Sequence, residues 1–364
     1  WFDPLTPGST VTWGGLWSWG RNNAGQLGLG NITNYSSPKQ VGALTTWSSI
    51  SCGSRHTVSI KTDGTLWSWG YNLYGQLGLG NTTSYSSPKQ VGALTTWLSV
   101  SCGYRYTVSI KTDGSLWSWG NNSLGQLGLG NTTYYSSPKQ VGALTNWLSV
   151  SCGYAHTVSI KTDGTLWSWG QNSNGQLGLG NITNYSSPKQ VGALTTWSSV
   201  LCGLWHTVSI KTDGTIWSWG RNVQGQLGLN NTVNYSSPKQ VGALTNWLSV
   251  SCGGYHTVSI KTDGTLWSWG RNNNGQLGLN NVTYFSSPKQ VGALTNWSSV
   301  SCGFDHTVSI KTDGTLWSWG YNAFGELGLG NITYYSSPKQ VGALTSWTKL
   351  FKSCTTYFTL AISS

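Results

Sequence analysis

Short runs of alternating apolar and polar residues, separated by clusters of Gly, Asn, Ser and Thr, recur along the chain every 50 residues. In one copy the runs Trp47–Cys52 and His56–Lys61 alternate in this way, and each predicts a strand. Asp63 and Gly64 predict a tight hairpin from the second strand into a third strand at residues 65–69. The local pattern therefore predicts three consecutive antiparallel strands in each copy.

A Gly-rich loop at residues 72–80 follows, and residues 86–91 predict a fourth strand. Pro88 has no backbone N–H, so this strand belongs at a sheet edge. Four antiparallel strands with such an edge form one blade of a β-propeller. The third strand carries Trp-Ser-Trp-Gly in seven copies, which begin at Trp17, Trp67, Trp117, Trp167, Trp217, Trp267 and Trp317. The pattern predicts an all-β, seven-bladed β-propeller with four antiparallel strands per blade.

The two ends of the chain hold complementary halves of one blade. A third-strand sequence occurs at residues 16–19 with no first or second strand before it. The chain ends with a first-strand sequence at residues 347–352 and a second-strand sequence at residues 356–361. We expect one blade to be built from both ends, which closes the ring. Residues 15–364 are then a single propeller, and residues 1–14 are an N-terminal extension or linker.

Two substitutions in the Gly-rich loop indicate its backbone conformation. Gly80 is replaced by Asn230 and Asn280 in two copies, and Asn is the non-glycine residue best able to adopt a positive φ. Each loop also contains Asn-x-Thr, which matches an N-glycosylation acceptor but is explained equally well by turn chemistry. These asparagines are Asn31, Asn81, Asn131, Asn181, Asn230, Asn281 and Asn331.

Charge and hydropathy exclude two classes of partner. The net charge is +11, but it is spread along the repeats as single lysines such as Lys39 and Lys61, set against Asp63 and its equivalents. No basic run is present, so specific nucleic-acid binding is not expected. No stretch of about 18 apolar residues occurs, so membrane insertion is not expected either.

The reactive residue types do not form a catalytic or metal-binding pattern. A Cys recurs at Cys52, Cys102, Cys152, Cys202, Cys252 and Cys302, usually four residues before a His, but zinc needs four ligands together and separate blades keep these copies apart. The histidines His56, His156, His206, His256 and His306 are replaced by Tyr106 and Thr356 in two blades, and we expect them to bond to backbone carbonyls. Six of nine acids are hairpin aspartates, which leaves Asp3, Asp305 and Glu326. We expect no enzyme activity, no cofactor and no metal.

The run Gly53-x-x-His56-Thr57, followed by Asp63-Gly64-Thr65-Leu66-Trp67-Ser68-Trp69-Gly70, resembles the repeat of the regulator of chromosome condensation family. The resemblance extends over residues 15–361 and implies a seven-bladed propeller. Members include an exchange factor for the GTPase Ran, a plant ultraviolet-B photoreceptor and binding modules of larger proteins. All repeats here keep their length, so no blade carries an inserted loop for nucleotide exchange. The Gly-Trp-Arg-His-Thr segments of the photoreceptor are also incomplete in this chain.

The copies differ mainly at two places, which are the residues after Trp-Ser-Trp-Gly and the two residues before each His. Both places lie in the connections from the first to the second strand and from the third to the fourth, which emerge at the same end of an antiparallel blade. Neutral drift in exposed loops is the alternative explanation, but drift does not explain why the loops at the other end barely vary. We therefore predict a partner-binding face formed by Arg21, Arg55, Tyr71, Tyr74, Tyr104, Arg105, Tyr154, Trp205, Arg221, Tyr255, Arg271, Phe304, Tyr321 and Phe324.

These features favour a non-enzymatic binding or assembly module. We expect it on a virion or cell surface, where the variable face recognises a glycan or a protein. One alternative is an intracellular regulator of a small GTPase, or a chromatin adaptor. Another is a purely structural subunit that packs against neighbouring subunits of an assembly.

Overall fold

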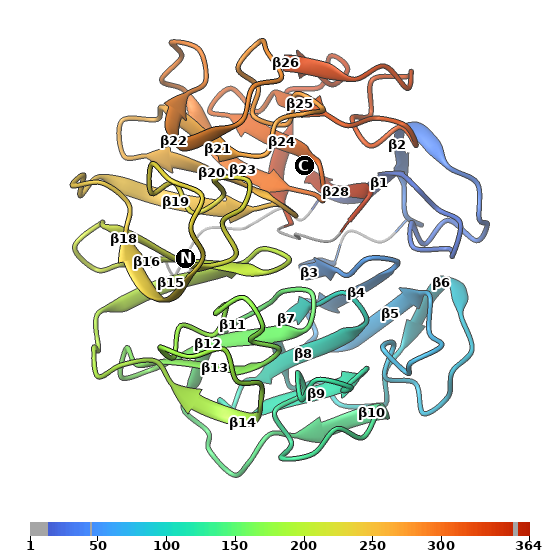
Figure 1. Ribbon diagram of the computed structural model, residues 1–364. Helices are drawn as coiled ribbons and strands as arrows, with labels where there is room; N and C mark the ends of the chain where they lie inside the picture. Colours follow the sequence, from blue (N-terminus) through green and yellow to red (C-terminus); the bar gives the residue numbers. More distant parts are fainter. Residues whose placement is uncertain (1–13, 44–45, 352–355) are drawn as a thin grey trace, which may run out of the picture.

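The computed structural model describes residues 14–43, 46–351 and 356–364, and these form seven four-stranded antiparallel sheets arranged in a ring (Figure 1). The closing blade contains β1 (Gly15–Gly20), β2 (Tyr35–Gln40), β27 (Trp347–Leu350) and β28 (Phe358–Ser363). The other six blades, numbered along the chain, are β3 (Trp47–Cys52), β4 (His56–Lys61), β5 (Leu66–Gly70) and β6 (Tyr85–Gln90); β7 (Trp97–Cys102), β8 (Tyr106–Lys111), β9 (Leu116–Gly120) and β10 (Tyr135–Gln140); β11 (Trp147–Cys152), β12 (His156–Lys161), β13 (Leu166–Gly170) and β14 (Tyr185–Gln190); β15 (Trp197–Cys202), β16 (His206–Lys211), β17 (Ile216–Gly220) and β18 (Tyr235–Gln240); β19 (Trp247–Cys252), β20 (His256–Lys261), β21 (Leu266–Gly270) and β22 (Phe285–Gln290); β23 (Trp297–Cys302), β24 (His306–Lys311), β25 (Leu316–Gly320) and β26 (Tyr335–Gln340).

Each blade follows the predicted order, with small shifts at the outer strands. The first two strands have the predicted bounds, whereas β5 and β6 differ from the predicted third and fourth strands by one residue at each end. Pro88 lies in β6, which is the edge strand. The second strand is buried along its length in most blades, and the edge strand is mostly half-buried or exposed. Asn230 and Asn280 have φ of 58°, as their place in the loop predicts.

Both ends of the chain build the closing blade, as predicted. β1 pairs with β2 on one side and with β28 on the other, and β27 pairs with β28. The Trp17 indole donates a hydrogen bond of 2.8 Å to the Ser363 hydroxyl. The ends of the chain are thus joined by backbone pairing and by side chains.

The register of the closing blade differs from the prediction by two residues. Phe358 pairs with Gly20 in the way that His56 pairs with Gly70. In the closing blade, Phe358 therefore occupies the position that the histidines hold in other blades. The prediction that Thr356 occupies this position was wrong. The connection before β28 is two residues longer than in the other blades, which moves the strand along the sequence. Cys354, another copy of the recurring cysteine, lies outside the described residues.

Adjacent blades are joined by one carbonyl group in each Gly-rich loop. The Gln26 carbonyl accepts hydrogen bonds of 2.9 Å from the Trp69 indole and the Thr57 hydroxyl of the next blade. The Glu326 carbonyl accepts the equivalent bonds from Trp19 and Thr359, at 2.8 and 2.9 Å. The same contact therefore joins the last blade to the closing blade, and the ring is continuous.

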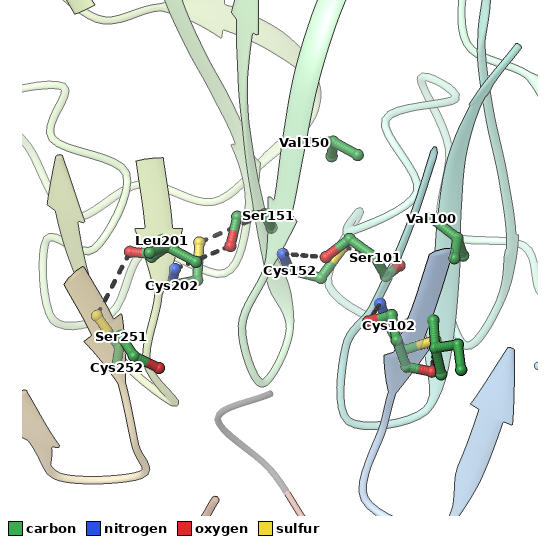
Figure 2. A pocket seen from close by; sticks show the side chains of 12 residues that line it. Val100, Ser101, Cys102, Val150, Ser151, Cys152, Leu201, Cys202, Ser251 and Cys252 are labelled. Atoms are coloured by element: carbon green, nitrogen blue, oxygen red, sulfur yellow. Dashed lines mark hydrogen bonds between the residues drawn. The ribbon is translucent and has the colours of Figure 1, made fainter. Parts of the chain in front are cut away.

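The first strands line a narrow central channel of about 200 Å³ (Figure 2). The Ser101 hydroxyl accepts a hydrogen bond of 3.0 Å from the backbone N–H of Cys152, and the Cys152 thiol lies 3.5 Å from the Ser101 carbonyl. Burial raises the pKa of Cys152 to about 12, so the thiol stays protonated at neutral pH. In the described part of the chain, no three His, Cys, Asp or Glu residues are placed to hold a metal ion.

Candidate functional site

The variable residues lie in loops of neighbouring blades that contact one another. The Arg105 guanidinium donates a hydrogen bond of 2.7 Å to the Tyr74 hydroxyl of the preceding blade, and it lies over the rings of Tyr74 and Tyr104. Within one blade, the Tyr71 N–H donates to the Arg55 carbonyl at 2.8 Å. The two sets of loops therefore form a common surface, which we call the variable face.

Six aromatic rings, one from each of six consecutive blades, follow one another along the variable face. We call this row the aromatic arc, and its members are Tyr104, Tyr154, Trp205, Tyr255, Phe304 and Tyr357. Successive ring centroids are 4.5, 5.4, 5.4, 5.9 and 4.8 Å apart. All six side chains are half-buried. The arc is therefore a continuous, partly exposed aromatic surface held by the rigid ring of blades.

Backbone hydrogen bonds between neighbouring loops hold the arc in place. The Tyr154 N–H donates to the Leu204 carbonyl at 3.1 Å, and the Phe304 N–H donates to the Thr356 carbonyl at 2.8 Å. Several of these loops are thus tied to the next loop as well as to their own strands. Fixed loops lower the conformational entropy that an aromatic contact loses on binding.

Tyr357 was missed by the sequence analysis. The predicted strand at residues 356–361 placed Tyr357 inside the sheet, whereas β28 begins at Phe358 and leaves Tyr357 in the preceding loop. The sequence did contain a sign of this, because the connection before this strand is two residues longer than in the other blades. The extra length places Tyr357 in the loop, where its ring stacks on Phe304. Tyr357 also contacts Tyr321 and Phe324, with centroids 5.6 and 6.2 Å away.

Arginine side chains lie against the aromatic arc and its neighbours. Arg221 lies over Trp205 and Tyr255, at 5.1 and 5.5 Å from the ring centroids. Arg21 lies over Phe324 at 4.9 Å and over Tyr357 at 5.9 Å. A cation–π contact at a partly exposed site stabilises by about 0.5 to 1 kcal/mol. These contacts hold the guanidinium groups in position, so their positive charge lies beside the aromatic rings of the variable face.

The two carboxyl groups of the variable face offset little of the arginine charge at neutral pH, because Glu326 is mostly protonated and the ionised Asp305 is paired with Arg271. Asp305 is 5% exposed, accepts a hydrogen bond of 3.0 Å from Gln276, and has Arg271 at 3.6 Å. Burial raises the pKa of Asp305 to about 6, although Arg271 opposes the shift. Burial also raises the pKa of Glu326, to about 8. The arginines therefore set the charge of this face.

The structure brings the remaining predicted residues into two further aromatic contacts. Tyr71 lies 6.4 Å from Tyr74, and Tyr321 lies 6.3 Å from Phe324, measured between ring centroids. Tyr321 is also 4.8 Å from Tyr334, at the start of the outer strand region. Every predicted site residue is thus placed on the variable face by contacts with other members of the set.

The buried histidines belong to the blade interfaces and not to this surface. His56 Nε2 lies 3.2 Å from the Thr107 hydroxyl of the next blade, where a backbone carbonyl had been expected. That hydroxyl donates to the Gln76 carbonyl at 2.9 Å, so His56 Nε2 carries the proton and donates to the hydroxyl. Burial lowers the pKa of His56 to about 3.

We expect Glu326→Gln to stabilise the protein above neutral pH. Glu326 replaces a Gln of the other copies, and its Oε2 accepts the Phe324 N–H at 2.9 Å, as Gln26 accepts the Ala24 N–H. Because folding raises the pKa of Glu326 from 4.5 to about 8, the stability falls as the pH rises between these values. The substitution should raise the unfolding free energy by about 4 kcal/mol at pH 7.5.

Urea unfolding of both proteins at several pH values measures this difference. The gain should shrink as the pH falls and be small at pH 4, where the carboxyl is protonated in both states. An equal gain at pH 4 and pH 7.5 would show that ionisation of Glu326 is not its cause.

Sequence and structure comparisons agree with this architecture. A model of the RCC1-like domain matches residues 141–364, and two models of the regulator of chromosome condensation (RCC1) repeat match earlier segments. These segments are residues 14–60, 63–110 and 113–160 for one model, and residues 47–76 and 97–126 for the other. The chain belongs to the RCC1-repeat family of seven-bladed β-propellers. No curated protein sequence matches it significantly.

Solved structures show the same fold at low sequence identity. Human WBSCR16 superposes with a TM-score of 0.87 at 22% identity, over 96% of this chain and 99% of WBSCR16. Yeast RCC1 (Prp20), solved with Kap60, gives 0.84 at 20% identity, over 97% of this chain and 90% of Prp20. A structure of Prp20p from Saccharomyces cerevisiae, described with its binding to Gsp1p and histones, gives 0.84 at 20% identity, over 98% and 93% of the two chains.

Proposed function

We propose that this propeller is a non-enzymatic recognition module that binds a glycan or a protein on an opposing surface through its variable face. The observation that carries the proposal is the aromatic arc with arginines lying against its rings. Tyr, Trp and Arg are the residues that most often dominate the energy of a binding surface. Here they differ from copy to copy, while the residues that join the blades stay the same.

The positive charge of the variable face favours a partner that carries acidic groups. Five arginines lie there, and the two carboxyl groups, those of Asp305 and Glu326, have raised pKa values. A partner with acidic groups complements this surface, and its approach is accelerated at low ionic strength. This favours an acidic patch on a protein or an acidic glycan, displayed on a virion, a cell or a neighbouring subunit.

The same charges argue against a role as a chromatin adaptor. Prp20, which shares the fold, is described with binding to Gsp1p and histones. Histones are basic proteins, and a basic partner would meet the five arginines with charge of the same sign. No connection between strands is lengthened by more than two residues, which leaves no inserted loop to enter the nucleotide site of a small GTPase.

We expect Trp205→Ala to weaken capture of the partner by about tenfold or more, because Trp205 is at the middle of the arc and contacts both Tyr154 and Tyr255. The measurement is binding of the intact chain to an array of glycans and proteins, followed by titration of the strongest hit. Leu248→Ala is the matched control, since Leu248 is 39% exposed and follows the invariant connection before β19.

Leu248→Ala should bind like the unchanged chain, and both variants should remain folded. The proposal is rejected if no array component is retained. It is also rejected if Leu248→Ala loses binding while Trp205→Ala keeps it.

A further inference from the structure

A second set of cavities lies between adjacent blades, away from the variable face. Three of them have volumes of about 380, 410 and 400 Å³, within the range of roughly 300–1,000 Å³ for small-molecule sites. Each is lined by the nearly invariant connection that leads to a first strand and by the third strand of the next repeat. In one of them the walls include Leu294, Trp297, Lys311 and Trp317. We call these cavities the rim pockets.

The walls of the rim pockets are the same in different blades. Leu294, Trp297 and Trp317 of one pocket correspond to Leu194, Trp197 and Trp217 of another. The sequence repeats these residue types in all seven copies, whereas the variable face differs in every copy. Identical pockets around a ring suit a ligand that is itself repeated, because simultaneous binding multiplies weak affinities.

In the pocket next to Trp317, the lining combines an aromatic wall with a lysine. Trp317 is half-buried, and Leu294, at the edge of the pocket, is 48% exposed. The Lys311 ammonium lies 3.8 Å from the Trp317 ring centroid. In the pockets next to Trp217 and Trp267, the corresponding lysine is 3.8 and 3.9 Å from the ring. The Trp317 ring can therefore pack against a flat apolar group of a ligand, with the Lys311 ammonium beside it.

This cation forms no salt bridge in the described part of the chain, although the Asp313 carboxylate lies close enough to oppose the lowering of its pKa by burial. The nearby Asp313 carboxylate accepts hydrogen bonds from the N–H and the hydroxyl of Thr315, at 3.0 and 2.6 Å, and forms no ion pair with Lys311. Burial lowers the pKa of Lys311. In addition, the Trp297 side chain is 4% exposed, and its indole N–H has no acceptor among the described residues. The pocket thus has a lysine in its wall, beside the rings of Trp297 and Trp317.

We infer that the rim pockets bind the acidic sugar units of a repetitive glycan, one unit per pocket. The C–H face of a pyranose ring packs against the half-buried Trp317 indole, as apolar faces do on aromatic walls. The carboxylate of the sugar lies toward the lysine ammonium, which gains an anionic partner. This site is independent of the variable face, so either site can exist without the other.

The test is calorimetric titration of the intact chain with two pairs of oligosaccharides. One pair is sialyllactose and lactose, and the other is trigalacturonate and galactotriose. We expect at least one acidic member to bind about tenfold or more tightly than its neutral counterpart, with several equivalent sites per chain. Equal affinity within both pairs, or no binding of either acidic member, would overturn the inference.

A pocket variant and a matched control locate the binding. The pocket variant replaces by Asp the three leucines that line the rim pockets and their equivalents in three other repeats, namely Leu194, Leu244 and Leu294 with Leu94, Leu144 and Leu344, which are 48–50% exposed. The control makes the same change in charge at six exposed residues outside the pocket walls, namely Ile32, Leu98, Leu148, Ile182, Leu248 and Ile332. The pocket variant should lose binding by about tenfold or more, and the control should lose much less.

Equal losses in the two variants would count against the rim pockets as the site. Trp205→Ala should leave this titration unchanged, which separates the result from that for the variable face. Because all twelve residues are exposed, both variants are expected to fold, and their melting temperatures check this.

Discussion

The propeller should lose about 5 kcal/mol of its unfolding free energy between pH 7.5 and pH 5, a large part of the total for most folded domains. The cause is the set of five buried histidines at the blade interfaces. Burial lowers the pKa of each of them from 6.5 to about 3. The unfolded chain therefore binds more protons than the folded chain once the pH falls below 6.5.

The size of the effect follows from linkage. At pH 5 each histidine favours the unfolded state by about 2 kcal/mol, and five of them by about 10 kcal/mol. Asp305 and Glu326 oppose this, because folding raises their pKa values to about 6 and 8. Their protonation as the pH falls therefore favours the folded state. Their contribution over this range is about 4 to 5 kcal/mol, which leaves the net loss given above.

Urea unfolding at pH 7.5, 6.5, 5.5 and 5.0 measures the loss. His206→Tyr and His206→Phe are suitable variants, since Tyr106 and Phe358 occupy the same position in other blades. Each variant should reduce the proton uptake on unfolding at pH 5 by about one, whatever its effect on stability at pH 7.5. An unfolding free energy that does not change between pH 7.5 and pH 5 would contradict the account.

Removal of residues 347–364 should lower the unfolding free energy by more than about 5 kcal/mol and destabilise the whole ring. The truncation removes β27 and β28 and leaves β1 and β2 as an isolated pair, which is marginally stable in water. Leu16 and Trp19, both fully buried, would lose their cover on one side. The hydrogen bond from Thr359 to the Glu326 carbonyl, which joins β28 to the last repeat, would also be lost.

Thermal unfolding monitored by tryptophan fluorescence compares the truncated and intact chains. A peptide of residues 347–364 added in excess should restore part of the stability, while a peptide with the same composition in scrambled order should not. A truncated chain that melts at the same temperature as the intact chain would contradict closure by the shared blade.

Much of the fold follows from local sequence because the repeat shows each signal seven times. Pro88 placed the fourth strand at the edge, and the Asn residues that replace Gly80 indicated a positive φ. The partner of His56 did not follow, because a threonine hydroxyl and a backbone carbonyl serve a buried donor equally well. The position of Tyr357 depended on strand register, which sequence periodicity leaves open by two residues.

The membership of the variable face was predictable from the differences among copies, but its internal order was not. No local pattern shows that Tyr104 stacks on Tyr154, or that Arg221 lies over the rings of Trp205 and Tyr255. The contacts of Tyr104 with Tyr154 and of Arg221 with Tyr255 join neighbouring blades and depend on the angle between them. The raised pKa values of Asp305 and Glu326 also required the burial of each side chain to be known.

The carbonyl contact between blades makes the variable loops interchangeable. The Gln26 carbonyl meets Trp69 and Thr57, and the Gln176 carbonyl meets Trp219 and Thr207 at similar distances. All of these groups are common to the repeats, so a genetic exchange between two copies in register preserves every such junction. What changes is the order of rings and guanidinium groups around the disc. A few residue choices, shuffled among seven positions, can thus generate many different surfaces on one unchanged ring.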